Sequence, residues 1–332
     1  MSDTEYDLTI IGGGPVGLFA AFYAGLQELK TQVIESLPQV GGQLTTLYPE
    51  KRILDVAGFS HVTAQELVDR LVAQTAEFPV TIKTSTTVTN VSGQLGDFTV
   101  TTDAEVTHSK TVLVTTGNGA FTPRKLAVEN AATFENRNLW YFVPKVAQFK
   151  DHDVMIAGGG DAAIDIALML EPVAHHVYLM HRRDTFRALP HSVTKLKAST
   201  IEPITPYLAS GLTAADDGKL TVDLKEMKTD NHRAITVDDL VVNYGFISDH
   251  SVFENWDLQF EQNRQQVAVD GSMKTSIDGI YAAGDTASYD GKVALIATGF
   301  GEAATAVHAA AFAADPHHRG PVHSTSVHLP SD

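Results

Sequence analysis

Residues 9–18 read Thr-Ile-Ile-Gly-Gly-Gly-Pro-Val-Gly-Leu, an apolar strand that runs into a glycine turn and then into a helix. Gly12, Gly14 and Gly17 have the spacing of the dinucleotide-binding fingerprint. In that motif Gly12 permits the tight turn, Gly14 lets a pyrophosphate approach the backbone, and Gly17 lets helix and strand pack closely. Pro15 lies at the start of the helix, whose N-terminus attracts phosphate charge. Other glycine-rich turns can share this spacing, so the motif needs support from downstream residues.

That support comes from an acid after the next β-prone run. Residues 31–35 read Thr-Gln-Val-Ile-Glu, and Glu35 lies 18 positions beyond Gly17. At this place the fingerprint has a carboxylate that hydrogen-bonds a ribose hydroxyl. A solvated charge at a strand end is the alternative interpretation. Because strand, turn, helix, strand and acid are all present, we expect a nucleotide-binding unit here.

The composition limits the function classes. A chain of 332 residues exceeds the usual size of a single core, so two domains are expected. With 24 basic and 40 acidic side chains the net charge is −16, which argues against general binding to nucleic acids or to anionic membranes. The sequence contains no cysteine, which excludes disulfides, thiolate metal sites and dithiol redox chemistry. No metal site is therefore expected.

Two further features of the sequence bear on the cellular location of the protein. The N-terminus, Met-Ser-Asp-Thr-Glu, carries acid where a secretory signal carries base. The apolar run from Ile10 to Leu26 is shorter than the roughly 20 residues of a spanning helix, and its five glycines and one proline fit a strand, a turn and a helix. We expect a cytoplasmic protein without a membrane segment.

A second copy of the opening pattern occurs 146 residues after the first. Residues 153–163 read Asp-Val-Met-Ile-Ala-Gly-Gly-Gly-Asp-Ala-Ala, with Gly158, Gly160 and Ala163 in the three key places. This distance indicates two nucleotide-binding units and not two halves of one. Asp161 and Ala162, at the start of the second helix, belong to the predicted site.

The two copies differ at the ribose position. Glu35 lies 23 positions after Gly12, whereas the residue 23 positions after Gly158 is His181, followed by Arg182, Arg183 and then Arg187. An acid in this place prefers a free 2′-hydroxyl, and a cluster of bases suits a 2′-phosphate. The first unit is therefore predicted to hold an adenosine ribose with a free 2′-hydroxyl, and the second to hold NADP. A surface basic cluster is the alternative.

A late strand, residues 279–286, ends in Gly-Asp and precedes a helix expected over residues 293–314. Two fingerprints plus this strand resemble the two-dinucleotide-binding-domain flavoproteins, and within them the thioredoxin reductase-like group. The resemblance implies an α/β fold of two Rossmann-like domains, with FAD in the first, Asp285 on the ribityl chain and the positive end of the last helix toward the flavin. The expected parts are 1–118 and 244–314 for the FAD-binding domain, 119–243 for the NADP-binding domain, and 315–332 for a tail over the flavin.

Thioredoxin reductases carry a Cys-x-x-Cys pair shortly before the second fingerprint, where this chain reads Trp140 to Lys145 without cysteine. Disulfide reduction by that route is excluded. The chain instead resembles the ferredoxin–NADP⁺ reductases of the thioredoxin reductase type, which lack the cysteines. They share the segments found here at Gly41 to Leu44, Tyr48 to Lys51 and His323 to Ser326.

This resemblance also implies a flavin pocket. Tyr48 stacks on one side of the isoalloxazine, His323 covers the other side with Thr325 nearby, and Gln43, Val88 and Phe121 complete the pocket. Ordinary core positions are the alternative for Val88 and Phe121, and a solvated histidine is the alternative for His323. The tail reaches the partner subunit, which implies a homodimer with one FAD per subunit. The predicted FAD-binding residues are Gly12, Gly14, Pro15, Gly17, Glu35, Gly42, Gln43, Tyr48, Val88, Phe121, Asp285 and Thr325, and the predicted NADP-binding residues are Gly158, Gly160, Asp161, Ala162, His181, Arg182, Arg183 and Arg187.

The expected reaction is hydride transfer from NADPH to flavin N5, followed by single-electron transfer to ferredoxin or flavodoxin, with no side chain acting as acid or base. A chain with a net charge of −16 repels such acidic carriers unless its docking face is locally basic. An NADPH-dependent reductase of a quinone, a flavin or another protein is therefore kept as the alternative. A non-catalytic redox sensor that binds FAD and NADPH is a further alternative from a different class.

Overall fold

The computed structural model describes residues 5–143, 145–215, 217–249, 253, 256–263 and 265–319, without the side chains of residues 120–122, 248 and 249. The chain forms two compact units. Unit 1 comprises Met1–Thr46, Arg52–Phe121 and Ser248–Asp332, and unit 2 comprises Leu47–Lys51 and Thr122–Ile247. The chain passes between the units at either end of the short segment Leu47–Lys51, within β9 (Ala120–Pro123) and within β18 (Phe246–Asp249). The strands β9 and β18 pair with each other.

The main sheet of unit 1 has the strand order β5-β2-β1-β8-β7-β6. β5, β2, β1 and β8 run parallel, β7 and β6 continue the sheet antiparallel, and β21 pairs in parallel with the second half of β8. The strands of unit 1 are β1 (Glu5–Ile11), β2 (Thr31–Ile34), β3 (Arg52–Ile53), β4 (Val62–Thr63), β5 (Thr81–Lys83), β6 (Val88–Gln94), β7 (Asp97–Thr102), β8 (Val106–Val114), β19 (Gln262–Asn263), β20 (Gln266–Ala268), β21 (Ile280–Ala282) and β22 (Ala287–Ser288).

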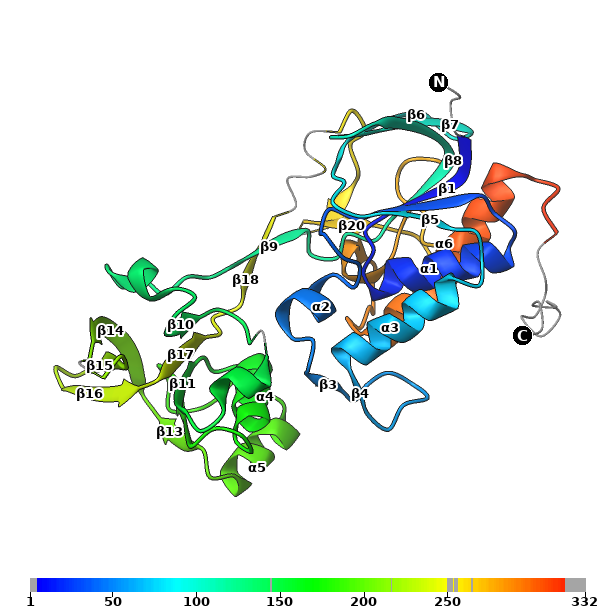
Figure 1. Ribbon diagram of the computed structural model, residues 1–332. Coiled ribbons are helices and arrows are strands. Elements are labelled where there is room, and N and C mark those ends of the chain that lie inside the picture. The colour runs from blue at the N-terminus through cyan, green and yellow to red at the C-terminus, as the bar shows by residue number, and fades with distance from the viewer. Residues whose placement is uncertain are drawn as a thin grey trace. The chain divides into compact units, whose positions relative to one another are not determined.

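Helices gather on one face of this sheet, as Figure 1 shows for α1, α3 and α6. Side chains of a strand alternate between its two faces. Ile10 of β1 accordingly packs against the small residues of α1 and α6, whereas the next residue, Ile11, belongs to the core on the opposite face with Phe98 and Trp256. The helical segments of unit 1 are α1 (Pro15–Leu26), α2 (Gln43–Leu47), α3 (Ala64–Thr75), α6 (Ile296–Ala314) and the 3-10 turn Gly284–Thr286.

The last helix begins later than the sequence predicts. We expected it to start at Val293, but Leu295 still has an extended backbone, with φ −129° and ψ 152°, so α6 starts at Ile296. The prediction fails because apolar composition does not reveal where a backbone turns out of the helical region. Within the part of the chain that the structure describes, no helix combines the length and the apolar character needed to cross a membrane.

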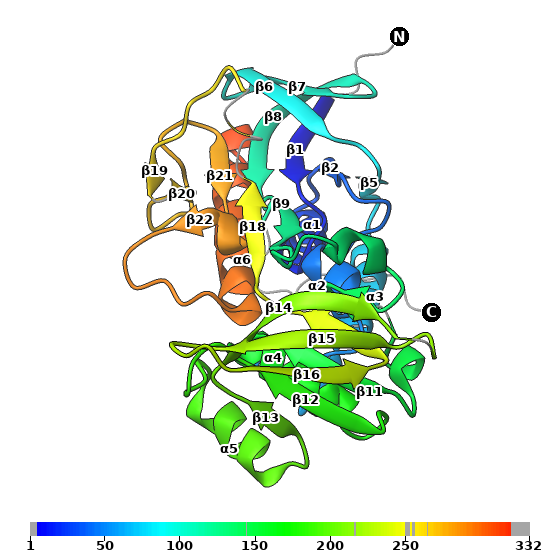
Figure 2. The ribbon, with the colours of Figure 1, turned by 90° about the vertical axis from the view of Figure 1, so that its left-hand side faces the viewer.

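Unit 2 contains a second parallel sheet, in the order β10-β17-β11-β12-β13. An antiparallel meander, β14-β15-β16, packs on one face of it, and α4 and α5 cover the other (Figure 2). Its elements are β10 (Leu139–Trp140), β11 (Asp153–Ala157), α4 (Asp161–Leu170), β12 (His176–Met180), α5 (Pro190–Ala198), β13 (Glu202–Ile204), β14 (Tyr207–Ala214), β15 (Leu220–Glu226), β16 (His232–Val237), β17 (Asp239–Val242) and the 3-10 turns Ala131–Phe134 and Val146–Phe149.

The central strand β11 explains this layering. Its residues alternate in the same way as those of β1, because Val154 and Ile156 face the helices whereas Met155 and Ala157 face the meander. All four side chains are fully buried. A strand that is apolar on both faces is typical of a parallel sheet covered on both sides.

Candidate functional site

The first glycine turn connects β1 to α1, and its glycines meet different surroundings. Gly12 has φ +109°, and a Cβ there would lie 2.5 Å from the carbonyl oxygen of Thr115. A Cβ on Gly17 would collide with the carbonyl oxygen of Gly12. A Cβ on Gly14 would meet nothing within 4 Å. Two glycines therefore permit close packing, and the backbone at Gly14, at the N-terminus of α1, is open to a ligand.

Glu35 follows β2 and binds directly to this turn. Its Oε2 accepts a hydrogen bond of 2.8 Å from the Gly13 amide, and its Oε1 accepts from the amide of Leu37 at 2.8 Å and from the hydroxyl of Ser36 at 3.3 Å. The residue is only 6% exposed. A carboxylate has about four acceptor positions, so one remains for a ribose hydroxyl.

The loop before α2 lies against the same turn. The Gly41 amide donates to the Gly13 carbonyl at 2.8 Å, and a Cβ on Gly42 would lie 3.4 Å from the Cα of Gly14. Gly42 has φ +56°, a conformation that glycine adopts without strain. Gln43 is the first residue of α2. The predicted residues Gly42 and Gln43 therefore lie beside the first turn.

Asp285 reaches the same edge of the sheet from the end of β21. In the parallel register Ala282 lies opposite Val114, which in turn lies opposite Ile11, so the strands β21, β8 and β1 end side by side. The Asp285 carboxylate accepts from Asn118 Nδ2 at 3.2 Å. In open α/β sheets ligands bind at the carboxyl ends of the strands, and here this edge gathers the turn, Glu35 and Asp285.

Five further residues were predicted to bind FAD, namely Val88, Tyr48, Phe121, His323 and Thr325. The side chain of Val88 is 5% exposed and packs in the core of unit 1, so only its main-chain groups can meet a ligand. Tyr48 is half-buried in the short segment that groups with unit 2, with Lys51 Nζ 5.4 Å from its ring centroid. The Phe121 side chain, His323 and Thr325 lie outside the described residues.

The second glycine turn connects β11 to α4 and is closely packed as well. A Cβ on Gly158 would lie 2.6 Å from both the Cβ of Ala163 and the carbonyl oxygen of Asn243. A Cβ on Gly159 would collide with the ring of His181. A Cβ on Gly160 would lie 3.8 Å from its nearest neighbour, the carbonyl oxygen of Arg187. The third glycine of this turn therefore has the same openness as Gly14 in the first.

His181 occupies the place that Glu35 occupies in unit 1, and it packs where Glu35 hydrogen-bonds. Its ring lies against Gly159 and stacks on Phe186 with centroids 5.6 Å apart. Burial lowers the pKa of His181, and the charges of the three neighbouring arginines lower it further. Its buried Nε2 has no hydrogen-bond partner among the described residues. We infer that His181 is neutral near pH 7 and adds no charge for a phosphate.

The charge of this site comes from Arg182, Arg183 and Arg187. All three residues are exposed, and none of them forms an ion pair with another described residue. These arginines lie on the loop between β12 and α5, residues 181–189, which we call the basic loop. The Arg187 amide donates to the Gly159 carbonyl at 2.6 Å and so connects the basic loop to the turn. Three uncompensated guanidinium groups beside a glycine turn suit a dinucleotide with an additional phosphate.

Asp161 and Ala162 are the first two residues of α4, and the Asp161 side chain binds the start of α5. Its Oδ1 accepts hydrogen bonds of 2.9 Å from the Leu189 amide and from the Ser192 hydroxyl. These bonds hold the start of α5, and with it the end of the basic loop. Ala162 is exposed beside it at the helix N-terminus. A role of Asp161 in positioning the loop is thus built into the fold.

Two residues at this site, Asn243 and Tyr244, are not among the residues predicted from the sequence. The Asn243 amide donates to the Ala157 carbonyl at 2.8 Å, and its own carbonyl occupies the space beside Gly158. The following Tyr244, whose side chain is 40% exposed, lies within range of the charge of Arg182. No local sequence signal marks these residues, because they reach the site through the parallel pairing of β17 with β11, which brings the carboxyl ends of the two strands together.

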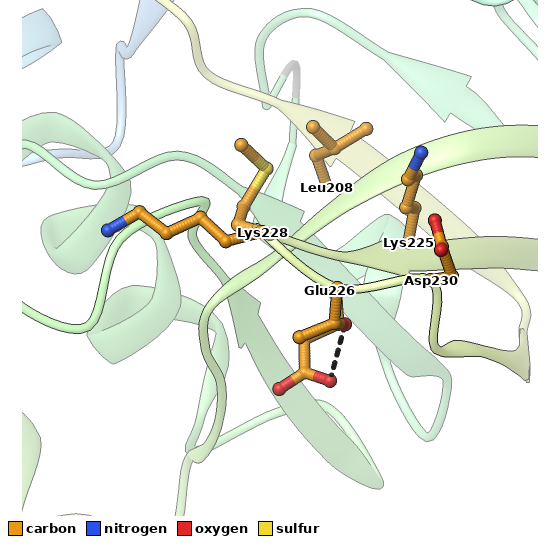
Figure 3. Close-up of a pocket in the computed structure, with 7 residues that line it drawn as sticks. Leu208, Lys225, Glu226, Lys228 and Asp230 are labelled. Atoms are coloured by element: carbon orange, nitrogen blue, oxygen red, sulfur yellow. Dashed lines mark hydrogen bonds between the residues drawn. The ribbon is translucent and has the colours of Figure 1, made fainter.

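An open depression of about 460 Å³ lies at the turn between β15 and β16 (Figure 3). Figure 3 shows the amines of Lys225 and Lys228 pointing in different directions. The acids Glu226 and Asp230 are part of the same lining. Side chains of both signs that do not converge make a poor site for one charged ligand. None of the residues predicted to bind a dinucleotide lines this depression.

Two glycine turns of this geometry, one beside an acid and one beside arginines, agree with a family comparison. The model of the pyridine nucleotide-disulphide oxidoreductase family matches residues 6–311. The chain belongs to this family. It is 52% identical to a ferredoxin–NADP reductase of Lactiplantibacillus plantarum over 97% of this chain and 98% of that protein. It is 51% identical to ferredoxin–NADP reductase 2 of Bacillus subtilis over 98% of both chains.

The solved structures agree as well. The thioredoxin reductase of Lactococcus lactis superposes with a TM-score of 0.79 at 26% identity, covering 93% of this chain and 99% of that one. The thioredoxin reductase of T. acidophilum, also at a TM-score of 0.79, shares the fold at 24% identity over 92% of this chain and 98% of that one. The predicted resemblance and the predicted fold class are thereby confirmed. The chain nevertheless has no cysteine for disulfide chemistry.

Proposed function

We propose that this chain is an FAD-dependent ferredoxin–NADP reductase that moves electrons between NADPH and ferredoxin. The observation that carries the proposal is the contrast between the two glycine turns. Glu35 binds the first turn and leaves room for a ribose hydroxyl, whereas the second is bordered by three arginines that form no ion pair within the described part of the chain. Relatives about half identical over nearly the full chain bear the same name, and the lack of cysteine separates the chain from thioredoxin reductases.

The residues of unit 1 fit FAD. The open backbone at Gly14 and the N-terminus of α1 accept the pyrophosphate, Glu35 the adenosine ribose, and Asp285 the ribityl chain. Gly42, Gln43 and the main chain of Val88 complete this part of the site. Bound FAD supplies the conversion between the two-electron chemistry of NADPH and one-electron transfer. The chain's own contribution is to bind and orient, and no side chain needs to act as acid or base.

The residues of unit 2 fit NADPH. The open third glycine of the turn, Gly160, and the N-terminus of α4 accept its pyrophosphate, and Arg182, Arg183 and Arg187 bind the 2′-phosphate. Neutral His181 supports the turn from below Gly159. Tyr48 and, from the tail, His323 and Thr325 are proposed to cover the isoalloxazine, with Phe121 nearby. The tail is proposed to act on the partner subunit's flavin in a cytoplasmic homodimer.

The charge distribution bears on the electron acceptor. Unit 1 contains 9 basic and 23 acidic side chains, a net charge of −14, whereas unit 2 contains 15 basic and 17 acidic side chains, a net charge of −2. An acidic carrier is therefore repelled mainly by unit 1. This distribution supports docking of ferredoxin, or of flavodoxin, with its acidic face toward unit 2. Because the chain as a whole still repels an acidic carrier, a quinone, a free flavin or another protein is kept as the alternative acceptor.

Stopped-flow oxidation of the NADPH-reduced protein tests the proposal. We expect reduced protein to be reoxidised rapidly by ferredoxin, and flavodoxin and menadione serve as the competing acceptors. A fast reaction with menadione together with a slow reaction with both protein carriers would favour the quinone reductase instead. A protein whose bound FAD is not bleached by NADPH would be a binding module and not an enzyme.

A further inference from the structure

Unit 1 contains a buried ion pair that neither fingerprint requires. Lys292 Nζ lies 2.9 Å from the Glu302 carboxylate, and the two side chains are only 10% and 4% exposed. Every other lysine–carboxylate pair among the described residues has both side chains at least 20% exposed. Burying two charges is costly, so such a pair is poor evidence for stability and calls for a specific role.

The pair binds both main-chain groups of one residue. The Gly284 amide donates to Glu302 Oε2 at 2.7 Å, and the Gly284 carbonyl accepts from Lys292 Nζ at 2.6 Å. The Tyr289 hydroxyl donates to Glu302 Oε1 at 2.8 Å. Burial, and next the bond to Glu302, raise the pKa of Tyr289 to about 12, so its phenol stays a donor. The Glu302 carboxylate is therefore held from three sides.

Besides these bonds, close packing also restricts the backbone of Gly284. Its φ is +71°, and a Cβ there would lie 3.2 Å from Val16 of α1. Gly299 of α6 packs against Val16 as well, so the turn lies between the two helices. An apolar pair of similar volume at 292 and 302 would leave the Gly284 amide buried without a partner, and the Gly284 carbonyl would keep only the hydrogen bond from the Ala287 amide. The charged pair satisfies both.

The next residue is Asp285. Its carbonyl accepts from Gln266 Nε2 at 2.7 Å, and the following Thr286 donates to the Gly117 carbonyl at 3.1 Å. The ion pair sets the peptide on one side of Asp285, and these two neutral bonds set the other. The direction of the Asp285 carboxylate thus depends on the contacts of Gly284.

We propose that Lys292 and Glu302 are positioning residues for FAD, which hold Gly284 so that the Asp285 carboxylate faces the ribityl chain. This inference rests on the proposed function, in which Asp285 binds FAD. Neither residue touches the cofactor, and neither belongs to a fingerprint. They lie ten positions apart, on the loop before α6 and within α6.

The test measures the affinity of the apoprotein for FAD, by quenching of flavin fluorescence, and the reduction potential of the bound flavin. Lys292→Met leaves the Gly284 carbonyl and Glu302 without their cation, and we expect the Kd for FAD to rise about tenfold or more. Tyr289→Phe removes one bond to Glu302 without uncovering Gly284, so its folding is not at risk, and we expect a smaller rise of about threefold. Both variants should also shift the potential.

Lys110→Met is the matched control, because it breaks the more exposed Lys110–Asp7 pair in the same unit. It should leave the Kd for FAD and the potential unchanged. If Lys292→Met and Tyr289→Phe lower the unfolding temperature of the apoprotein but keep the wild-type Kd and potential, the pair only stabilises the fold and the inference is wrong. If Lys292→Met does not fold, a wild-type Kd and potential in Tyr289→Phe contradict the inference. A wild-type protein that binds no FAD would instead refute the proposed function.

Discussion

The Glu35 carboxylate accepts a hydrogen bond of 2.8 Å from the amide of Gly13, and so joins the end of β2 to the middle of the first glycine turn. The same carboxylate also accepts from the amide of Leu37. Glu35 therefore has two tasks, since it shapes the turn and offers its remaining acceptor position to a ligand. In unit 2 the ring of His181 fills the corresponding space beside Gly159.

Glu35→Gln should weaken FAD binding. The amide keeps one acceptor but places a donor where the turn or the ribose needs an acceptor, and hydrogen bonds to charged groups contribute about 1.5–3 kcal/mol. We expect the Kd of the apoprotein for FAD to rise about tenfold or more. Glu77→Gln, which changes an exposed acid of the same unit, is the control and should bind FAD normally. An unchanged Kd in Glu35→Gln would remove this acid from the site.

Arg182→Ala combined with Arg183→Ala should separate the two nicotinamide cofactors. Loss of charge-assisted contacts to the 2′-phosphate should raise the KM for NADPH by about tenfold or more, whereas the KM for NADH, which lacks that phosphate, should change little. Steady-state kinetics with both cofactors measures the difference. Lys195→Ala combined with Lys197→Ala removes two exposed charges from α5 and should affect neither KM. Equal losses with both cofactors would contradict the 2′-phosphate assignment.

His181 should make the folded protein less stable as the pH falls. Its pKa is lowered in the folded state, so the unfolded chain binds the proton more readily, and the contribution of His181 declines as the pH falls below its unfolded pKa of about 6.5. We expect thermal unfolding of His181→Phe to depend less on pH between about 7.5 and 5 than that of the wild type. His191→Phe replaces an exposed histidine of α5 and should keep the wild-type slope. The same slope in His181→Phe and the wild type would mean that His181 titrates normally.

Salt should accelerate the reaction with an acidic carrier. With a net charge of −16, of which unit 1 holds −14, the long-range force on ferredoxin is repulsive and is screened as ionic strength rises. We expect the second-order rate constant to increase about twofold or more between roughly 20 and 200 mM salt. Menadione is uncharged and should show no such dependence. A rate constant for ferredoxin that falls with salt would reveal a local basic docking face strong enough to dominate.

The sequence predicted the turns well because their constraints are local. Gly12 needs a positive φ and Gly17 needs the absence of a Cβ, and both requirements appear directly as residue type. The contrast between Glu35 and His181 with its arginines is readable for the same reason, since the spacing from turn to strand end is set by one helix and one strand. The start of α6 was predicted three residues too early, because nothing local in the sequence announces the extended backbone of Leu295.

Other parts of the site have no local signature. Asn243 was not predicted, although its carbonyl packs beside Gly158, because the pairing of β17 with β11 is a tertiary fact. Val88 was assigned to the flavin pocket by position, and because its side chain is buried in the core, that assignment remains a prediction for its main chain. The assignments of the Phe121 side chain, His323 and Thr325 remain predictions, since they lie outside the described residues.

The sequence by itself determined the fold class, the presence of two dinucleotide turns and the difference in charge between them. Each of these follows from residue type and spacing within a single strand-turn-helix-strand unit. Only the tertiary structure decided that Asp161 holds the basic loop and that Lys292 and Glu302 hold Gly284. The physical reason is that hydrogen bonds between distant segments depend on how helices and strands pack against each other. No local sequence pattern shows which distant segments will meet.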